Sequence, residues 1–580
     1  MKKTISRLKD ILKPHIKTVI LVSIFAILID IIEIVKPYIT KIVIDDFLAN
    51  KLFNNGMLSI DILGMIYLSL VILGAIIDYT TRMKTNIMGE KILFEMRNKI
   101  FRYSQFAEVK FHDKTPAGKL YARIINDIDD VSNLFKDVIS TLFKDIISIV
   151  SVIGIMIYFS YKLSILALSV LPFVIIISIV LTKVLNHIYD VSKAVRTNLN
   201  TFFAESIYGA KIIKIFSIQK EKIEECEGYT KEFMVKRMPS ALLEGIFPGI
   251  MIFFENLATT FIIVGTVYHV FGIVANVGEV FIFTTYIKSL FRPINRIIDA
   301  VETIQEAIVS IDKIYDILEN EDVLEDFDEG IVLPKKIPGK IEFKNVWFAY
   351  KDDNWILKNV SFTIEPGETI ALVGRTGSGK TTITNLVNRF YEIQKGEILI
   401  DGINIKDINK SSLREHVGIV LQDPFIFSRT IKENIRLNQD ISDDNIKKAI
   451  YDASAKEFID TLPEGINEVS KERGESFSAG QKQLIAFARI FAHDPDIFIL
   501  DEATANIDTY TEGLIQKSID RLSKEKTAIF IAHRLSTIVN VDKILVLQNG
   551  EIIEEGSHKD LLEQNGAYAK LYNQYYESLG

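Results

Sequence analysis

Six long apolar stretches in the first 300 residues constrain the fold more than any other feature of this 580-residue sequence. A helix needs roughly 20 predominantly apolar residues to cross a bilayer, and each stretch is long enough to do so. The stretches lie near residues 17–36, 58–79, 134–160, 162–185, 246–270 and 277–298. The sequence therefore predicts an all-α transmembrane domain of six long helices.

The connections between these stretches alternate in length and charge. Those after the second and fourth stretches, about residues 80–132 and 186–244, are long and rich in Lys and Arg, whereas the others are short. Lys and Arg are enriched in the cytoplasmic loops of membrane proteins. We therefore expect a multi-pass protein of the cell membrane with the long connections and both termini in the cytoplasm. Few helix breakers interrupt the long connections, so the helices are expected to extend well beyond the bilayer.

The pattern changes after the sixth stretch. Seven of the eleven residues 319–329 are Asp or Glu, and Pro334 and Pro338 follow, which is typical of a linker. Short apolar strands then alternate with helical segments, as in an α/β domain with a largely parallel sheet. The predicted organisation is a transmembrane domain over residues 1–318, a linker over 319–339 and an α/β domain over 340–580.

Charge and cysteine content argue against two other classes of protein. The net charge of -8 gives no support for nucleic-acid binding, which usually shows as a basic face. The single cysteine, Cys226, allows neither an internal disulfide nor a thiolate cluster for a metal.

The strongest local pattern is a phosphate-binding loop. GRTGSGKT, residues 374–381, matches G-x-x-x-x-G-K-[ST] between the apolar strand TIALV and the helical segment TITNLVNRF. Its glycines let backbone N–H groups surround phosphate oxygens, and the helix N-terminus adds its dipole. Lys380 supplies charge to the β- and γ-phosphates, and Thr381 offers a hydroxyl to Mg²⁺. The predicted nucleotide contacts here are Gly374, Arg375, Thr376, Gly377, Ser378, Gly379, Lys380, Thr381 and Thr382.

Two further segments carry residues suited to the same chemistry. In IFILDE, four apolar residues fit a central strand of a parallel sheet, and ligands bind at the carboxyl ends of such strands. There Asp501 is placed to hold Mg²⁺ through water, and Glu502 to orient or deprotonate the attacking water. Ser478 and Gly480 begin another helical run, which is either a second anion-binding helix tip or ordinary helix capping.

Over nearly its whole length the sequence resembles the half-size ABC exporters, in which a membrane domain precedes a nucleotide-binding domain with a helical subdomain. A lone Tyr or His is usually structural, but Tyr350 and His533 lie at the family's spacing from the other motifs. Tyr350 resembles the aromatic that stacks on adenine, residues 374–381 the Walker A loop, Gln422 the Q-loop glutamine, Phe477–Gln481 the signature, Asp501 the Walker B aspartate, Glu502 the catalytic glutamate, Asp508 the D-loop aspartate and His533 the switch histidine.

The resemblance implies ATP and Mg²⁺ as cofactors. It assigns catalysis to Glu502, His533 and Gln422, the metal to Thr381, Gln422 and Asp501, and further nucleotide contacts to Tyr350, Ser478, Gly480, Gln481 and Asp508. Segments near 111–118 and 205–216 resemble the family's two coupling helices, although on spacing alone they also suit ordinary solvated helix. KERG, residues 471–474, resembles the loop that senses them.

A partner is also implied, because each ATP in this family lies between the Walker A loop of one subunit and the signature of the other. The signature departs from the family's LSGGQ, since Ala479 replaces a glycine and Phe477 a leucine. An altered signature beside an intact Glu502 is typical of one half of a heterodimeric bacterial multidrug exporter. A heterodimer of two ABC half-transporters is therefore the favoured expectation, and a homodimer is the alternative.

The expected function is ATP-driven export of amphipathic or hydrophobic compounds by alternating access, with membrane lipid as a further partner. A lipid flippase and an ATP-gated channel or regulator are the alternatives. Asp30 and Glu33 lie within the first apolar stretch and Glu255 within the fifth. Carboxylates inside a membrane are costly and often functional. They are candidates to contact cationic substrates, unless they pair with basic residues or lie near helix ends.

Overall fold

The computed structural model describes residues 2–49, 59–319, 329–351, 354–501, 507–524, 526–531 and 539–577. The chain divides into two units. One contains residues 1–105 and 116–321, and the other contains residues 106–115 and 322–580. The described part of the first unit is helical, and both sheets belong to the second unit.

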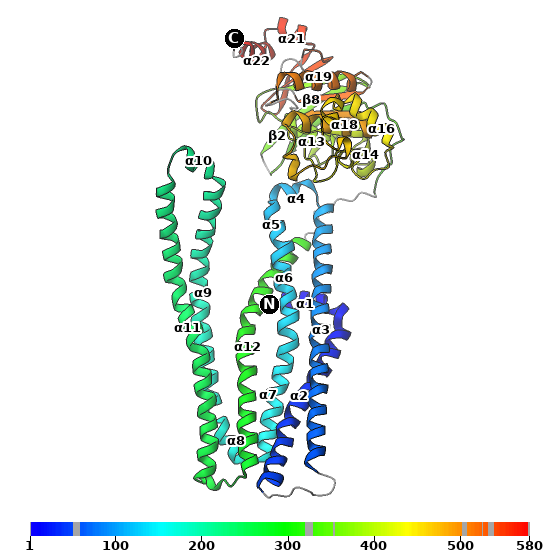
Figure 1. Ribbon diagram of the computed structural model, residues 1–580. Helices are drawn as coiled ribbons and strands as arrows, with labels where there is room; N and C mark the ends of the chain where they lie inside the picture. Colours follow the sequence, from blue (N-terminus) through cyan, green and yellow to red (C-terminus); the bar gives the residue numbers. More distant parts are fainter. Residues whose placement is uncertain are drawn as a thin grey trace. The chain divides into compact units, whose positions relative to one another are not determined.

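Long helices build the first unit (Figure 1). Helices α3, α9 and α11 have 47, 38 and 49 residues. At 1.5 Å per residue α3 is about 70 Å long, more than twice the roughly 30 Å of a bilayer's hydrocarbon core. The prediction that the helices are longer than the bilayer is thick is therefore confirmed for α3. The helices of this unit are α1 (Lys2–Leu12), α2 (Ile16–Ile42), α3 (Ile60–Phe106), α5 (Ala117–Ala122), α6 (Ile128–Asn133), α7 (Ser140–Phe159), α8 (Tyr161–Leu168), α9 (Leu171–Tyr208), α10 (Ala210–Ile215), α11 (Gln219–Val267) and α12 (Val277–Leu318).

The six apolar stretches fall largely on these helices. In the described part of the chain, four helical stretches are long and apolar enough to cross a membrane: Ser6–Leu48, Ile60–Phe106, Tyr161–Tyr208 and Gln219–Val267. The third and sixth predicted stretches lie mainly on α7 and α12, which are helical but include charged residues such as Lys144 and Arg292.

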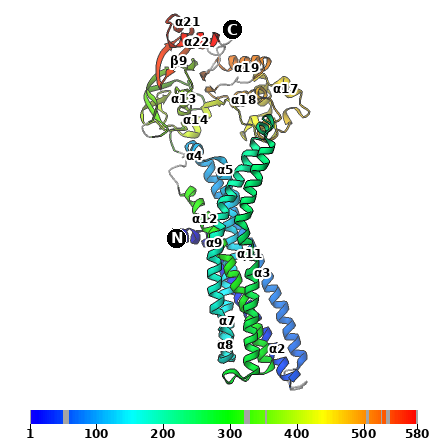
Figure 2. The ribbon, with the colours of Figure 1, turned by 90° about the vertical axis from the view of Figure 1, so that its left-hand side faces the viewer.

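Two local features differ from uninterrupted helices. The fourth predicted stretch is broken between α8 and α9, where Pro172 occupies the first turn of the new helix, a position at which its missing N–H costs no hydrogen bond. Both long connections are helical, as predicted, and each contains a short helix: α4 (Val109–Lys114) follows α3, and α10 joins α9 to α11 at the end of that helix pair (Figures 1 and 2).

Two sheets form the frame of the second unit. A six-stranded sheet has the order β10-β9-β3-β8-β7-β6, and its neighbours are parallel except for β10 against β9. This confirms the predicted, largely parallel sheet. A four-stranded antiparallel sheet, β2-β1-β4-β5, was not predicted. An apolar core between the sheets includes Phe343 and Leu372, and a second core, which includes Phe487 and Phe498, packs the helices on the other face.

The elements of this unit run in chain order as follows. They are α4 (Val109–Lys114), β1 (Ile341–Ala349), β2 (Trp355–Ile364), β3 (Thr369–Val373), α13 (Lys380–Val387), β4 (Lys395–Ile400), β5 (Ile403–Asn404), α14 (Lys410–His416), β6 (Val417–Val420), α15 (Ile431–Arg436), α16 (Asp443–Asp452), α17 (Lys456–Asp460), α18 (Ala479–His493), β7 (Ile497–Asp501), α19 (Thr509–Leu522), β8 (Thr527–Ile531), β9 (Lys543–Gln548), β10 (Glu551–Gly556), α21 (His558–Glu563) and α22 (Ala567–Glu577).

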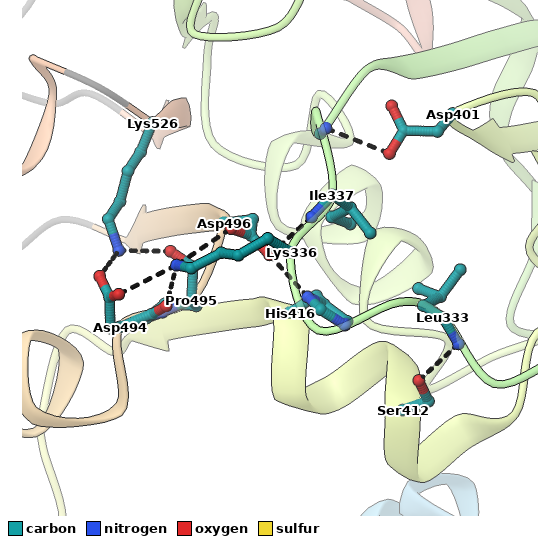
Figure 3. A network of polar contacts seen from close by, with 11 residues as sticks. Leu333, Lys336, Ile337, Asp401, Ser412, His416, Asp494, Pro495, Asp496 and Lys526 are labelled. Atoms are coloured by element: carbon teal, nitrogen blue, oxygen red, sulfur yellow. Dashed lines mark hydrogen bonds and ion pairs between the residues drawn. The ribbon is translucent and has the colours of Figure 1, made fainter.

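Residues 329–339 of the predicted linker are bound to the second unit (Figure 3). The Leu333 and Ile337 side chains are buried in the core between the sheets. Lys336 Nζ lies 2.9 Å from a carboxylate oxygen of Asp494, and this hydrogen bond raises the pKa of Lys336. These residues therefore pack as part of the second unit's fold.

Candidate functional site

The loop predicted to bind phosphate follows β3, whose five residues are all buried, and leads into α13. Gly377 and Gly379 have φ angles of 82° and 109°, in the left-handed region that side chains disfavour. A Cβ atom at Gly374 would come within 2.3 Å of the Leu547 carbonyl oxygen. The loop's conformation therefore depends on glycine at these positions.

The Lys380 side chain folds back over this loop. Its Nζ donates hydrogen bonds to the carbonyl oxygens of Gly374 at 2.7 Å and Arg375 at 3.2 Å, and the residue is only 5% exposed. The ammonium group is thus held within the loop as a fixed point charge, which is the feature a phosphate-binding lysine needs.

The remaining loop residues fit a phosphate site. Arg375, Thr376 and Thr381 are exposed, whereas Ser378 and Thr382 are buried. The Ser378 hydroxyl is buried and has no hydrogen-bond partner among the described residues. A buried hydroxyl without a partner is costly, and a phosphate oxygen would satisfy it.

Tyr350, the predicted adenine-stacking residue, lies beside the first turn of α13. Its hydroxyl is 3.3 Å from Thr382 Oγ1, and its ring makes edge contacts with Phe348 and Tyr391 at centroid distances of 4.8 and 4.9 Å. The ring is held on one side and 38% exposed overall, which leaves area on which a base can stack.

Tyr391 also contacts one of the two segments predicted to form coupling helices. Residues 106–115, which include α4, belong to the second unit, and the Tyr391 hydroxyl donates a hydrogen bond to the Asp113 carboxylate of α4. The predicted adenine-binding residue is therefore one aromatic contact away from α4.

The parallel strands bring several predicted residues to one edge of the sheet. The phosphate loop follows β3, Asp501 is the last residue of β7, and Gln422 comes two residues after the end of β6. Because β3, β8, β7 and β6 are parallel neighbours, their carboxyl ends share this edge, where ligands of such sheets bind. Glu502 follows Asp501 directly and His533 follows β8 by two residues, but both lie outside the described residues.

The three predicted metal ligands offer only oxygen atoms, the donors that Mg²⁺ prefers, from Thr381, Gln422 and Asp501. Across the described ranges, no group of three His, Cys, Asp or Glu side chains is arranged to hold a metal ion. The oxygen donors of Thr381, Gln422 and Asp501 fit a magnesium ion that is bound together with nucleotide phosphates, which is the usual arrangement for Mg²⁺ in ATPases.

The segment resembling the signature forms the start of α18. The Ser478 side chain accepts from the Gln481 N–H, and the Gln481 side chain accepts from the Ser478 N–H, which is a reciprocal helix cap. Ala479 is exposed in this first turn. A Cβ atom at Gly480 would come within 2.4 Å of Thr511, so this glycine also lets α18 pack closely on α19. The ordinary capping role is thus present, and it leaves the helix tip on the surface.

Asp508 caps the neighbouring helix α19. Its carboxylate accepts from the Thr511 N–H at 2.9 Å, and this bond holds the pKa of Asp508 below its ordinary value. The residue that resembles the D-loop aspartate therefore has a structural role at the helix start.

Gln483 was not predicted as a site residue. It lies on α18 and donates to the backbone carbonyl oxygens of Leu421 and Gln422. In the sequence it is one polar residue in the helical run KQLIAFARIF, and no spacing rule distinguishes it from a solvated side chain.

The three carboxylates of the apolar stretches have different surroundings. Glu33 is exposed and forms an ion pair with Lys36 at 2.6 Å. This agrees with the alternative expectation that such carboxylates pair with basic residues. Asp30 is only 4% exposed, and its Oδ2 atom has no hydrogen-bond partner within the described part of the chain. Glu255 lies on α11 and is partly exposed. Asp30 is therefore the strongest of the three candidates.

Comparison with known proteins finds two family models. The ABC transporter transmembrane region matches residues 19–294, and the ABC transporter model matches residues 357–505. Among curated relatives, a probable multidrug resistance ABC transporter ATP-binding/permease protein of Bacillus subtilis is 36% identical over 87% of this chain and 76% of its own length. An ATP-dependent lipid A-core flippase of Syntrophus aciditrophicus is 32% identical over 98% of this chain and 93% of its own.

A solved structure agrees with these relatives. A bacterial Atm1-family ABC exporter with ATP bound matches with a TM-score of 0.77 and 25% identity, over 97% of this chain and 98% of that one. A helical membrane domain, an α/β domain with a phosphate loop and this likeness over nearly the whole chain point to one family. The chain belongs to the ABC transporters, as an ATP-hydrolysing half-transporter of the exporter type.

Proposed function

We propose that this chain exports amphipathic or hydrophobic compounds from the cell as one half of a dimeric transporter. The observation that carries the proposal is the convergence of Lys380, Asp501 and Gln422 at one sheet edge, in a chain that also has apolar helices long enough to cross a membrane. The multidrug and flippase names of its relatives support substrates with both apolar and polar parts. Lipid is the second candidate substrate, because one relative is named as a flippase.

Reconstitution tests this proposal. The full-length transporter in lipid vesicles is given ATP, and the movement of a cationic amphipathic dye and of a fluorescent lipid analogue is followed, with a non-hydrolysable nucleotide as control. ATP-dependent movement of the dye supports export, and movement of the lipid alone supports the flippase. Intact ATPase activity without movement of either probe would contradict both.

At the ATP site we assign separate tasks to the residues. Tyr350 stacks on the base, residues 374–382 with Lys380 bind the phosphates, and Thr381, Gln422 and Asp501 hold Mg²⁺. Glu502 deprotonates the attacking water, with Gln422 and His533 assisting. Mg²⁺ neutralises charge on the phosphates when bound. Ser478, Gly480, Gln481 and Asp508 contact the nucleotide bound by a partner subunit.

For the membrane we propose that both termini and the ATPase domain are cytoplasmic, with the domain bounds 1–318, 319–339 and 340–580. The basic N-terminal segment supports this orientation. Arg7 pairs with Asp312 at 2.6 Å and with Glu319 at 2.7 Å, so the start of the chain lies beside the end of α12. An even number of crossings places both ends on one side in this way.

We propose a heterodimer, with the altered signature serving the partner's weaker site. Ala479→Gly restores the residue that the family has at this position. It should change the turnover of the heterodimer by less than about twofold, because the exposed residue 479 lies at the partner's ATP site, which contributes little hydrolysis. The measurement is ATPase activity of the chain purified alone and with a second half-transporter. Full activity from the chain alone, with a several-fold gain from Ala479→Gly, would instead show a homodimer.

The buried carboxylate of Asp30 is proposed to contact the cationic group of a substrate. Asp30→Asn keeps the side chain's shape but removes its charge, so transport of cationic dyes should fall about tenfold, the size of one lost charge-assisted hydrogen bond. Glu33→Gln is the matched control, because Glu33 is exposed and already paired with Lys36. Vesicle transport of a neutral dye should be unchanged in both variants, and an equal loss for cationic and neutral dyes would rule out the contact.

A further inference from the structure

Helix α18 holds two segments of the candidate ATP site at once. Ser478 caps its N-terminus, and Gln483 lies five residues later, about 7.5 Å along the helix axis. Gln483 is only 2% exposed. Its Nε2 atom donates to the carbonyl oxygen of Gln422 at 2.9 Å and to that of Leu421 at 3.3 Å.

The Gln483 amide can take only this orientation. If it were reversed, its oxygen would face the two carbonyl oxygens of Leu421 and Gln422, and no hydrogen bond would form. The Oε1 atom is buried and has no hydrogen-bond partner within the described ranges. Within the described residues, the hydrogen bonds of this buried amide are thus both directed at the backbone that carries Gln422.

Helix α18 also holds the other end of the segment around Gln422, residues 421–427, through Asn434. Arg489 Nε donates to the Asn434 carbonyl oxygen at 2.7 Å. The Asn434 side chain in turn donates to the Phe427 carbonyl oxygen at 2.9 Å and accepts from the Phe427 N–H at 2.8 Å. Residues 421–427 form neither helix nor strand, so these side chains from α18 and α15 fix the position of their backbone.

We propose that Gln483 is a positioning residue that fixes the backbone around Gln422 to α18, the helix whose first turn resembles the signature. In this way it couples the two ATP sites of the dimer. The inference rests on the proposed function, in which Gln422 serves the subunit's own nucleotide and Ser478 serves the partner's. Because fewer than two helix turns separate Gln483 from Ser478, a displacement of Gln422 at one site moves the helix tip at the other. Gln483 itself touches neither nucleotide.

Gln483→Met tests this coupling in the full-length transporter, since Met has similar length and flexibility but no donor. The control is Gln516→Met on α19, where the Gln516 amide donates to Asp520 of the same helix. ATPase activity is measured against ATP concentration. We expect kcat to fall about tenfold with KM within about twofold, and the Hill coefficient to fall from above one in the wild type to one.

Two further readouts separate positioning from a general loss of structure. The melting temperature of Gln483→Met should stay close to that of the control, while amide hydrogen exchange of residues 421–427 should increase. Gln483→Lys keeps a donor of similar reach and should restore most of kcat and the Hill coefficient.

Kinetics of Gln483→Met equal to those of Gln516→Met, an equal loss in Gln483→Lys, or a wild-type Hill coefficient of one would overturn the coupling. Failure of the proposed function would be seen separately, as a wild-type chain whose ATPase activity does not differ from that of Lys380→Ala.

Discussion

Glu502→Gln is expected to slow ATP hydrolysis by roughly 10²–10⁴-fold, the usual effect of removing a general base, while ATP binding persists. Asp501, the residue before it, ends β7 at the sheet edge that also holds the phosphate loop. Glutamine keeps the shape of the side chain but cannot accept a proton from water. Phosphate release by the purified transporter measures the loss, and binding of a fluorescent ATP analogue measures what remains.

The matched control is Glu563→Gln, which makes the same substitution at an exposed position near the end of α21. Its hydrolysis rate should equal that of the wild type. In a heterodimer, Glu502→Gln should nearly abolish turnover of the whole complex, because the partner's site contributes little. Hydrolysis by Glu502→Gln within about twofold of the control would show that another group accepts the proton.

Features set by the local order of residues were predicted well. The phosphate loop lies between β3 and α13 because TIALV forms a buried strand, and positive φ angles at Gly377 and Gly379 require glycine. The six apolar stretches fall largely on helices for a similarly local reason. The break before α9 was missed because the polarity of Ser169 and Val170 does not distinguish them from residues of a continuing helix. Only Pro172 marks the start of α9.

Features that depend on distant contacts were not predicted. The linker's Pro334 and Pro338 indicate an extended segment, but its binding to the second unit depends on Asp494, more than 150 residues away. Glu33 and Asp30 are one turn apart in the sequence, yet only the structure shows that Glu33 pairs with Lys36 and that Asp30 is buried. Gln483 gains its meaning from the carbonyl oxygens of another segment, which no pattern within its own helix encodes.

Lys380→Ala is expected to weaken ATP binding itself, by roughly 10–100-fold, the range for losing a charge-assisted hydrogen bond to phosphate. The ammonium group is buried in the loop and directed at the carbonyl oxygens of Gly374 and Arg375, so no surface lysine can replace it. Calorimetric titration with ATP measures the change. Lys447→Ala on the exposed face of α16 is the control and should bind as the wild type does.

Lys380→Ala tests nucleotide binding and Glu502→Gln tests the hydrolysis step, so the two variants separate binding from chemistry at the same sheet edge. Lys380→Met keeps more of the buried side-chain volume than alanine does, so it distinguishes the lost charge from a collapsed loop. A loss of ATP affinity in both Lys380 variants, with melting temperatures close to that of Lys447→Ala, assigns the effect to the ammonium charge. Unchanged affinity in Lys380→Met would mean that the glycines and the N-terminus of α13 bind the phosphates without it, and the predicted role of Lys380 would be wrong.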